Sequence, residues 1–366
     1  MNWILAILLS FSLLSNDYVN INTADEEALQ VLPGIGPVKA SSIVAYRSLF
    51  GPFMELSELE YVSGIGPGTV AMLEDLVFID TSLISAADTL HWIEKVDSLS
   101  PALIVSYLDV GQGDAILVEA VGGQTLLFDG GPDARGPLEP SVVYRLLELD
   151  VDTIDILSFS HPHADHVGGL ASVMRNFTVL EVMDPGMPFS SWLYEDFLNS
   201  VMDEGCDYRF LEAGMTFQLS PVVTVCVVYL GSEGADLNIN ESSALLRITC
   251  GNFSTLLTGD MEEESERNCT PDALPVTVLK VPHHGSLTSI FPPYLRRLSP
   301  QAAVFSAGRN NSFGHPHPRV IEIYRELGSE ILRTDTQGTI VVQTDGEVFS
   351  ISTLMAGFYP GINIEN

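Results

Sequence analysis

Three histidines and one aspartate fall within six consecutive positions of the segment SFSHPHADHVGG, residues 158–169. They are His161, His163, Asp165 and His166. The chain has eight histidines in 366 residues, so composition alone would produce this spacing on the order of once in 5,000 such chains. Neutral imidazoles and carboxylates are good ligands for zinc and similar divalent ions. Because burying three unligated imidazoles is costly, we interpret the segment as a metal site.

The residues around this cluster predict its place in the fold. VDTIDIL before it is typical of a buried strand, and VGGLASVM after it is typical of the start of a helix. The cluster therefore falls on a loop at the C-terminal end of a strand, where side chains can converge in a cleft. His161 and His163 can face one ion, and the adjacent Asp165 and His166 can face a second. Two such ions could deprotonate a bridging water near neutral pH.

Four more histidines occur in two further motifs, each after an apolar run. VPHHGS contains His283 and His284, and GHPHP contains His315 and His317. Seven of the eight histidines thus lie in three motifs. Two adjacent histidines before Gly-Ser seldom serve a core, which favours a functional role for VPHHGS. GHPHP is open to two interpretations, a catalytic loop or a rigid loop whose prolines set its shape.

Acidic and basic side chains beside these motifs complete the predicted site. Asp260 in LLTGD is suited to bridge two metal ions, and Asp129 in LLFDGG could orient a ligand from behind. Hydrolysis by a metal-held hydroxide also needs groups that hold an anionic substrate or protonate the leaving oxygen. Lys280 and Arg309 are candidates for that role. The residues predicted to take part directly in catalysis are Asp165, Lys280, His284, His315 and His317.

The elements that must position these residues form a pattern of short apolar runs from Ala102 onward. The runs include ALIVSYLDV, AILVEA, TLLFDGG, VVTVCVVYL, STLLTGD and VTVLKVPHHG, with occasional helical stretches between them. Strands interleaved with helices predict a layered α/β fold.

A repeat near the N-terminus predicts a second, smaller domain. LPGIGPVKASSI at 32–43 returns 30 residues later as VSGIGPGTVAML at 62–73. Glycine permits the tight turn, and the following proline can open a helix. In this helix-hairpin-helix pattern, turn amides and a helix N-terminus can hold a phosphate without reading bases. The predicted nucleic-acid contacts are Gly34, Gly36, Lys39, Gly64 and Gly66. A packing or protein-docking role is the alternative.

Charge and the N-terminal segment bear on the environment of the protein. The chain has 16 basic and 48 acidic residues, a net charge of −32. This charge repels polyanions at long range, so we expect saline or divalent-rich surroundings and no broad basic groove, although the charge could serve solubility alone. Residues 3–14 form an apolar run of the length of a signal-peptide core, but without a preceding Lys or Arg. We expect cleavage near Ser15 and export, or an uncleaved anchor.

Residues 18–79 closely resemble the DNA-binding domain of ComEA-type competence proteins. The matching stretches are VNINTADEEALQVLPGIGPVKASSIVAYR, GPF and VSGIGPGTVAML. The resemblance implies non-specific binding of double-stranded DNA. Only Lys39 and Arg47 are basic in this module, so we expect modest and salt-sensitive affinity.

Residues 102–353 resemble a metallo-β-lactamase-fold hydrolase, specifically the C-terminal domain of ComEC-type competence proteins. The matching stretches are LDVGQGDAILVE, LLFDGG, SHPHADHVGGL, LLTGD, LKVPHHGS, GHPHP and RTDTQGTIVVQTDG. The resemblance implies an αββα sandwich with a two-metal site. One ion would take His161, His163 and Asp260. The other would take Asp165, His166, Asp260 and one histidine of the 283–284 pair, for which His283 is favoured.

The chain departs from the broader superfamily between these motifs. Most relatives supply a further histidine before the bridging aspartate, whereas this chain has Asn240 and Ser243 in that stretch. The first ion site is therefore expected to be weaker or to hold manganese rather than zinc, and operation with one ion remains open.

Together these patterns predict the organisation of the chain. The expected parts are a signal peptide or anchor at 1–15, a small all-α helix-hairpin-helix domain at 18–80, a linker at 81–101, the α/β hydrolase domain at 102–353 and a tail at 354–366. The first functional hypothesis is an exported metal-dependent phosphodiesterase acting on DNA, in a periplasmic, cell-surface or extracellular location. The alternatives are a hydrolase of another phosphoester, or a non-catalytic DNA-binding component of DNA uptake. Whether the four cysteines pair is left open.

Overall fold

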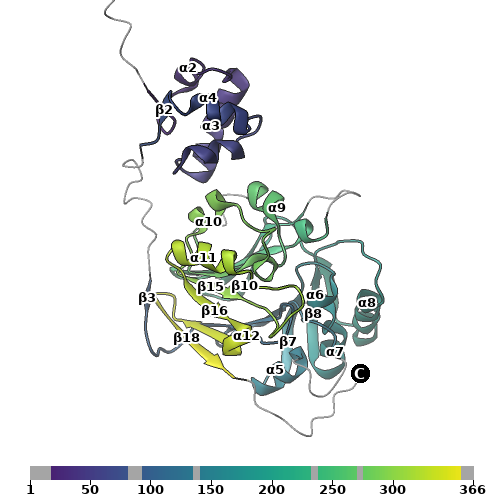
Figure 1. Cartoon of the computed structure of the whole chain (residues 1–366). Helices are drawn as coiled ribbons and strands as arrows, with labels where there is room; N and C mark the ends of the chain where they lie inside the picture. The colour runs from purple at the N-terminus through teal and green to yellow at the C-terminus, as the bar shows by residue number, and fades with distance from the viewer. Residues whose placement is uncertain (1–17, 81–92, 135–140, 232–237, 270–274, 356–366) are drawn as a thin grey trace, which may run out of the picture. The chain divides into compact units, whose positions relative to one another are not determined.

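The computed structural model describes residues 18–80, 93–134, 141–231, 238–269 and 275–355 (Figure 1). The chain divides into two compact units, Met1–Leu90 and His91–Asn366. The expected leader at 1–15 and most of the expected tail lie outside the described residues. Within the described ranges, no helix combines the length and the apolar character needed to cross a membrane.

The small unit contains both copies of the repeat. Its helices are α2 (Glu26–Leu29), α3 (Pro37–Phe50), the 3-10 helix η1 (Leu56–Tyr61) and α4 (Pro67–Leu73), and the short strands β1 (Val19–Asn20) and β2 (Val77–Phe78) pair in parallel. Gly36 and Gly66 are the N-caps of α3 and α4, and a proline opens each helix. Gly34 and Gly64, with φ of 78° and 81°, make the turns that precede them. Both predicted hairpins are therefore present.

The large unit is built on two sheets. The first contains, in spatial order, β3 (Glu94–Lys95), β18 (Val348–Leu354), β17 (Thr339–Thr344), β4 (Leu103–Tyr107), β5 (Ile116–Ala120), β6 (Thr125–Phe128), β7 (Thr153–Ser158), β8 (Thr178–Asp184) and β9 (Asp207–Phe210). The second contains β10 (Thr216–Ser220), β11 (Val223–Tyr229), β12 (Leu245–Cys250), β13 (Phe253–Leu257), β14 (Val278–Lys280), β15 (Ala302–Phe305) and β16 (Glu330–Arg333). Strands β6 to β9 and β13 to β16 run parallel to their neighbours.

Helices cover the outer faces of the two sheets, which makes four layers. The first sheet carries α5 (Val142–Glu148), α6 (Ala164–Val167), α7 (Leu170–Asn176) and α8 (Trp192–Glu204). The second sheet carries α9 (Glu263–Asn268), α10 (Pro292–Leu298) and α11 (Pro318–Glu326). The short helix α12 (Thr334–Gln337) connects β16 of the second sheet to β17 of the first, and the 3-10 helices η4 (Asn240–Ser242) and η6 (Pro282–Gly285) lie in the loops before β12 and after β14. This is the αββα architecture that the resemblance to metallo-β-lactamase-fold hydrolases implies.

Apolar side chains on both faces of the central strands explain the layers. In β6, Leu126 and Phe128 join the core between the sheets, whereas Leu127 points to the core under the helices. The near-continuous apolar runs of the sequence are thus strands that are buried on both faces.

Part of the expected linker belongs to the large unit. Glu94 and Lys95 pair with β18, and the backbone of Ile93 exchanges hydrogen bonds with the Gln301 side chain at 3.0 and 3.1 Å. The first part of the expected linker, residues 81–92, lies outside the described part of the chain.

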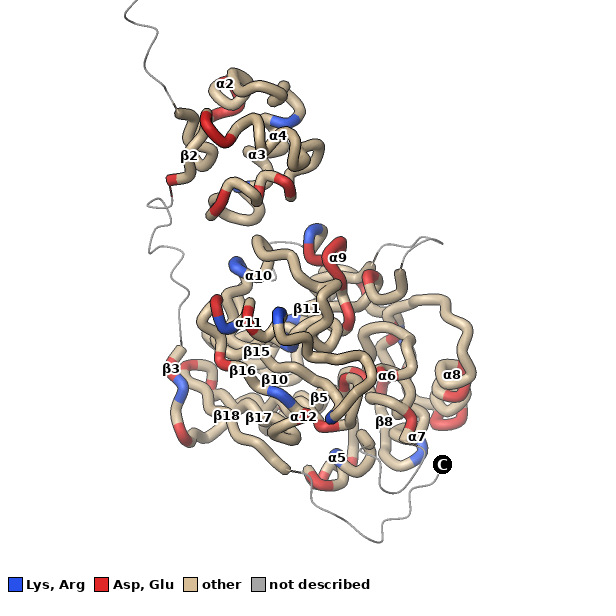
Figure 2. The backbone as a smooth tube through the Cα atoms, in the orientation of Figure 1, with Lys and Arg blue, Asp and Glu red and all other residues tan. Residues whose placement is uncertain are grey.

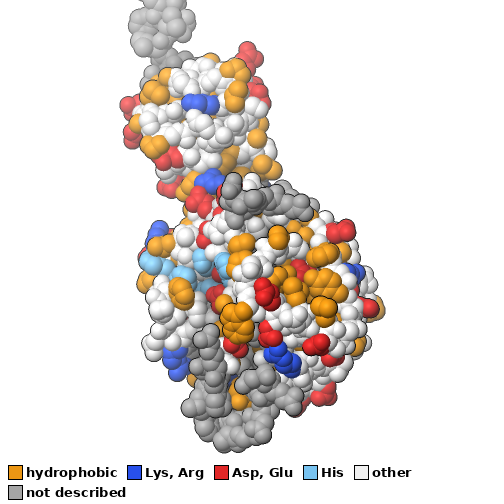
Figure 3. All heavy atoms as spheres, turned by 90° about the vertical axis from the view of Figure 1, so that its right-hand side faces the viewer, with side chains coloured by type: hydrophobic (Ala, Val, Ile, Leu, Met, Phe, Trp, Pro, Cys, Tyr) orange, Lys and Arg blue, Asp and Glu red, His pale blue; other side chains and the backbone are white. Residues whose placement is uncertain are grey.

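The parallel strands bring the sequence motifs to one edge of each sheet. The loops after β6, β7, β13, β14 and β15 all leave C-terminal strand ends, and they carry Asp129, the 161–166 cluster, Asp260, the 283–284 pair and the GHPHP loop. In Figure 3 the histidine side chains gather in one patch on the surface of the large unit.

Candidate metal centre

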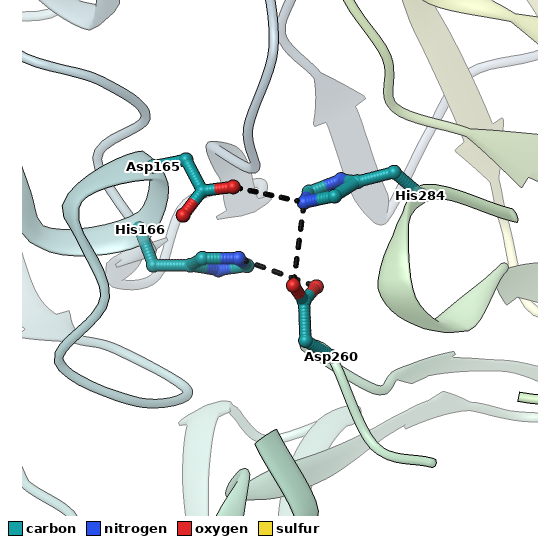
Figure 4. Close-up of side chains that lie close together, drawn as sticks. All are labelled: Asp165, His166, Asp260 and His284. Atoms are coloured by element: carbon teal, nitrogen blue, oxygen red, sulfur yellow. Dashed lines mark ion pairs between the residues drawn. The ribbon is translucent and has the colours of Figure 1, made fainter. Parts of the chain in front are cut away.

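Four side chains from three loops converge at this edge (Figure 4). Asp165, His166, Asp260 and His284 each offer a ligand atom, and these atoms lie within 4.8 Å of one another. His166 Nε2 is 3.2 Å from Asp260 Oδ1, and His284 Nε2 is 3.4 Å from Asp260 Oδ2. His284 Nε2 is also 3.3 Å from Asp165 Oδ2. Asp165, His166 and Asp260 are three of the residues predicted for the second ion. The fourth member of the group is His284 from the 283–284 pair.

The buried atoms of this group fit a divalent cation. Among the described residues, His166 Nε2, Asp260 Oδ1 and His284 Nε2 are buried and make no hydrogen bond of acceptable geometry. Leaving buried polar atoms without a partner costs about 1–3 kcal/mol each. Here the three atoms face a common point, and two imidazole nitrogens with carboxylate oxygens form a donor set that suits zinc or manganese. An ion held between them would remove that penalty.

The backbone after β14 explains why His284 rather than His283 enters this group. His283 and His284 both have left-handed backbone conformations, with φ of 47° and 54°. His283 N donates to Gly259 O at 3.1 Å, which fixes the turn against the loop that carries Asp260. The turn directs the second imidazole inward, whereas the His283 ring is partly exposed. The preference for His283 as ligand, inferred from chain order, does not match this placement.

Two buried carboxylates hold the ligand imidazoles from behind. Asp129 Oδ2 lies 3.0 Å from His166 Nδ1, and its Oδ1 accepts from Ser160 N at 2.6 Å. Asp129 thus occupies the orienting position expected from LLFDGG. His284 Nδ1 lies 2.9 Å from Ser306 O and 3.4 Å from Asp114 Oδ1. Because Nδ1 of each ring has a partner, Nε2 of each ring is left to face the ion site.

Asp114 also belongs to the buried group around the centre, although the sequence motifs did not single it out. It is fully buried and pairs with Lys280 Nζ, which also donates to Gly259 O at 3.1 Å. The only signal for Asp114 was its place in the matching stretch LDVGQGDAILVE. Lys280 is itself fully buried, so the structure does not bring it to the substrate, where a catalytic role was expected. Its contacts are with the buried residues that support the centre.

The charges of the centre are mutually dependent. Burial lowers the pKa of His166 and His284, but the surrounding carboxylates outweigh it and raise both values well above the ordinary one. Burial raises the pKa of Asp260 and Asp165, but the two imidazoles bring both below the usual range. Without a metal ion, the positive charges of the two protonated imidazoles therefore balance the negative charges of the carboxylates. A divalent cation would supply the same positive charge when the two imidazoles lose their protons on metal binding.

His161 and His163 lie beside this group without joining it. His161 Nε2 is 3.0 Å from His163 Nδ1, and His161 Nδ1 is 3.0 Å from Ser160 Oγ and 3.4 Å from Ser243 Oγ. Ser243 Oγ also accepts from Asp260 N at 3.1 Å. Burial lowers the pKa of both imidazoles, so they are neutral, as metal ligands must be. Neither imidazole belongs to a close ligand group of the described residues, and a site with His161, His163 and Asp260 stays a prediction.

The remaining histidines occupy the rim. His283 Nδ1 lies 2.9 Å from Thr288 Oγ1 and 3.2 Å from Glu262 Oε1, and its Nε2 is 3.7 Å from Asp260 Oδ2. The His315 ring centroid is 5.6 Å from that of His283. Burial and the neighbouring imidazoles lower the pKa of His315 to about 4, so this ring is neutral at pH 7.

His317 and Arg309 are engaged elsewhere. His317 is the N-cap of α11, where its Nδ1 accepts from Arg319 N at 3.1 Å. Arg309 Nε donates to Asp335 O at 3.2 Å. The structure thus gives His317 a structural contact in place of the catalytic one expected, which favours the interpretation of GHPHP as a shaped loop for this residue.

The predicted nucleic-acid residues lie on the hairpins of the small unit. The exposed turns contain Gly34, Gly36, Gly64 and Gly66, and a side-chain carbon at Gly64 would lie 3.7 Å from Lys39 Cε. The Arg47 side chain has a structural role, since its guanidinium donates hydrogen bonds to Ile21 O and Ala24 O, both at 2.6 Å.

Within the described residues, no disulfide joins any of the four cysteines, Cys206, Cys226, Cys250 and Cys269.

Comparison with known proteins agrees with this division into two parts. The family model for the helix-hairpin-helix motif matches residues 15–78, and the model for the metallo-beta-lactamase superfamily matches residues 108–193. The chain is 29% identical over 266 residues to ComE operon protein 3 of Bacillus subtilis (strain 168), covering 68% of this chain and 34% of that protein. It is 30% identical over 264 residues to Recombination protein 2 of Haemophilus influenzae, covering 71% of this chain and 31% of that protein.

A third relative is Competence protein ComA of Neisseria gonorrhoeae, 28% identical over 244 residues, with 64% of this chain and 31% of that protein covered. The chain spans about a third of the length of these curated relatives. It therefore carries a helix-hairpin-helix motif followed by a metallo-beta-lactamase superfamily domain, and it is related to competence proteins.

Proposed function

We propose that this protein is an exported metal-dependent phosphodiesterase that acts on DNA. The observation that carries the proposal is the convergence of Asp165, His166, Asp260 and His284, with buried ligand atoms that lack other partners, in a metallo-beta-lactamase superfamily domain. A bound divalent ion at this point supplies a nucleophile from water near neutral pH and polarises a phosphoryl oxygen.

The side chains around the centre have distinct tasks in this proposal. Asp129 and Asp114 hold the ligand imidazoles, so the four ligands are positioned before substrate arrives. Glu262 and Thr288 fix the His283 ring at the rim. His283 and the neutral His315 are then placed to donate hydrogen bonds to a bound phosphodiester without adding a buried charge.

The small unit would hold the polymer near the hydrolase. Two glycine turns followed by helix N-termini are a means of binding phosphates through backbone amides, independent of base sequence. Of the two basic side chains in the described hairpins, Arg47 is held by hydrogen bonds to backbone carbonyls, so Lys39 is the one left to contact a phosphate. DNA is therefore the substrate that best accounts for both units.

Metal loading and cleavage test the catalytic part of the proposal. Protein stripped with a chelator and reloaded with zinc or manganese should nick plasmid DNA and hydrolyse bis(p-nitrophenyl) phosphate. Both activities of the Asp260→Asn variant should fall at least about 100-fold, because the change removes the carboxylate that lies between the two ligand imidazoles. Asp184→Asn is the matched control, since Asp184 is equally buried but bonds to tyrosines. No bound metal, or equal activity in the Asp260 variant, would refute the proposal.

A second candidate function is hydrolysis of another phosphoester, with the small unit docking a partner protein. The charge of the small unit favours it, because residues 18–80 contain nine acidic and two basic residues. Lys39→Gln separates the two candidates. If DNA is the substrate, this variant should bind and cleave DNA several-fold less well while its hydrolysis of bis(p-nitrophenyl) phosphate is unchanged; if not, both activities stay equal to wild type.

Export is the remaining part of the proposal and depends on the apolar run at 3–14. Fractionation of cells that make the full-length protein, followed by N-terminal sequencing, tests it. Recovery of the intact N-terminus in the cytoplasmic fraction would contradict export.

A further inference from the structure

A cavity of about 500 Å³ lies at the same edge of the second sheet as the metal centre. Its wall comes from the loop after β15, from α11 and from the segment after β16. A volume of this size lies within the range of small-molecule sites in proteins. The residues that line it include Asn311, His315, Arg325, Arg333 and Asp335.

His315 connects this cavity to the metal centre. It lines the cavity, and its ring centroid lies 6.3 Å from that of His284, which is one of the four ligands. The connection follows from topology, because β14, β15 and β16 are parallel neighbours and their C-terminal loops lie side by side. A substrate bound at the metal centre could therefore extend past His315 into the cavity.

The wall of the cavity is shaped in advance. Asn311 Oδ1 accepts from the backbone N–H groups of Phe313 and His315, at 3.1 and 3.0 Å, and its Nδ2 donates to Gly308 O at 2.9 Å. These bonds hold the loop from 308 to 315 together. A site that is ordered before binding loses less conformational entropy when its ligand arrives.

The wall of the cavity contains two arginines and one aspartate. The chain is strongly acidic, and ion pairs to carboxylates occupy many of its arginines; in the described residues these are Arg145, Arg175, Arg209, Arg267, Arg319 and Arg333. Arg325 is exposed at the rim of the cavity, and in the described part of the chain no ion pair or hydrogen bond engages its guanidinium. Beside it, Asp335 accepts from Nε and Nη2 of Arg333, at 2.9 and 2.6 Å, which holds that guanidinium in the wall.

We propose that this cavity is the subsite for the phosphate next to the scissile phosphodiester, with Arg325 as its main cationic contact. The inference rests on the proposed function and deepens it, because it requires a substrate with at least two phosphates. A guanidinium that has no acidic partner, beside a polar cavity of nucleotide size, is suited to a phosphate group. Arg333 and Asn311 would shape the subsite by keeping its walls in place.

Two chromogenic substrates with the same scissile bond test the subsite. They are the 5′-(p-nitrophenyl phosphate) of thymidine with and without a 3′-phosphate. For the metal-loaded full-length protein, we expect the extra phosphate to lower KM about tenfold, the equivalent of one charge-assisted contact. The Arg325→Ala and Arg325→Glu variants should reduce that ratio of KM values to about one, and Arg325→Lys should restore part of it.

Arg319→Ala is the matched control, since Arg319 is on the same helix, is exposed and pairs with Glu322 and Glu326. It should keep the full KM ratio, and thermal unfolding should confirm that every variant is folded. If wild type hydrolyses both substrates with equal KM, or if Arg325→Glu keeps the ratio, the subsite is refuted while the phosphodiesterase remains. If neither substrate is hydrolysed with any divalent ion, the proposed function itself fails.

Discussion

The adjacent histidines of VPHHGS show how far two neighbouring residues can differ in role. Both follow the same strand, yet His284 is buried against three carboxylates and His283 is partly exposed at the rim. The difference comes from two consecutive left-handed residues, a conformation that non-glycine residues seldom adopt and that is found at functional sites. Chain order cannot reveal such a turn, so the choice between the two imidazoles required the structure.

Asp129 supports a prediction about metal affinity. Asp129→Asn keeps the size of the side chain, and asparagine tolerates the left-handed backbone at this position, where φ is 64°. The neutral amide is a weaker partner for His166 Nδ1, so we expect metal affinity to fall about 10- to 100-fold. Competition titration with a chromophoric chelator measures it. The Asp184→Asn control should lower the unfolding temperature and leave metal affinity intact.

Glu266 supports a prediction about pH and stability. It is fully buried in α9, and burial raises its pKa well above the ordinary value of 4.5. Below pH 4.5 both folded and unfolded chains hold this proton. As pH rises further, the unfolded chain releases its proton first, so the free energy of unfolding falls until the folded pKa is passed.

The Glu266→Gln variant should therefore be more stable than wild type at pH 7, with the difference vanishing near pH 4. Urea unfolding of metal-free protein across this range measures the difference. A stability gain that is independent of pH would show that ionisation of Glu266 is not its cause.

At the scale of elements, the glycines after the histidine cluster allow the close packing of α6 and α7 on the loop that carries Asp129. A Cβ at Gly169 would lie 2.2 Å from Gly130 O and 2.8 Å from Val142 Cγ1. Backbone atoms cannot move aside without shifting the whole loop. The small size of Gly169 is therefore needed for the loop that carries Asp129 to keep its position.

Gly169→Ala should consequently destabilise the large unit by about 1–3 kcal/mol and weaken metal binding. The backbone of Gly169 itself has an ordinary conformation, so the effect would come from contact alone. Chemical denaturation and metal titration measure the two effects. Ser172→Ala, a change on α7 that keeps the helix backbone, should affect neither; an equal loss in that variant would exclude the steric explanation.

At the scale of the whole molecule, negative charge dominates. Figure 2 shows acidic residues spread over both units and few basic ones. In the small unit, the Arg47 guanidinium is bonded to backbone carbonyls, which leaves Lys39 as the other basic residue of the described hairpins. If the small unit binds DNA as proposed, we therefore expect its described residues to neutralise few phosphates.

The salt dependence of DNA binding should reflect this. We expect the slope of log affinity against log salt to be about −1, because each neutralised phosphate contributes about −0.9. Fluorescence anisotropy with a labelled duplex between 50 and 200 mM salt measures the slope, using full-length protein with Asp260→Asn to prevent cleavage. A slope of several units would mean that basic residues elsewhere contact the duplex.

The sequence by itself indicated a helix-hairpin-helix part followed by an α/β part, and it predicted a metal site. Local rules sufficed there: glycine and proline define the hairpins, apolar runs define strands buried on both faces, and clustered histidines after strand ends indicate metal. The tertiary structure alone decided which residues meet. Asp114 lies more than 160 positions before Lys280 and His284 in the sequence. Their contact depends on strand order and on a left-handed turn, neither of which is encoded in local spacing.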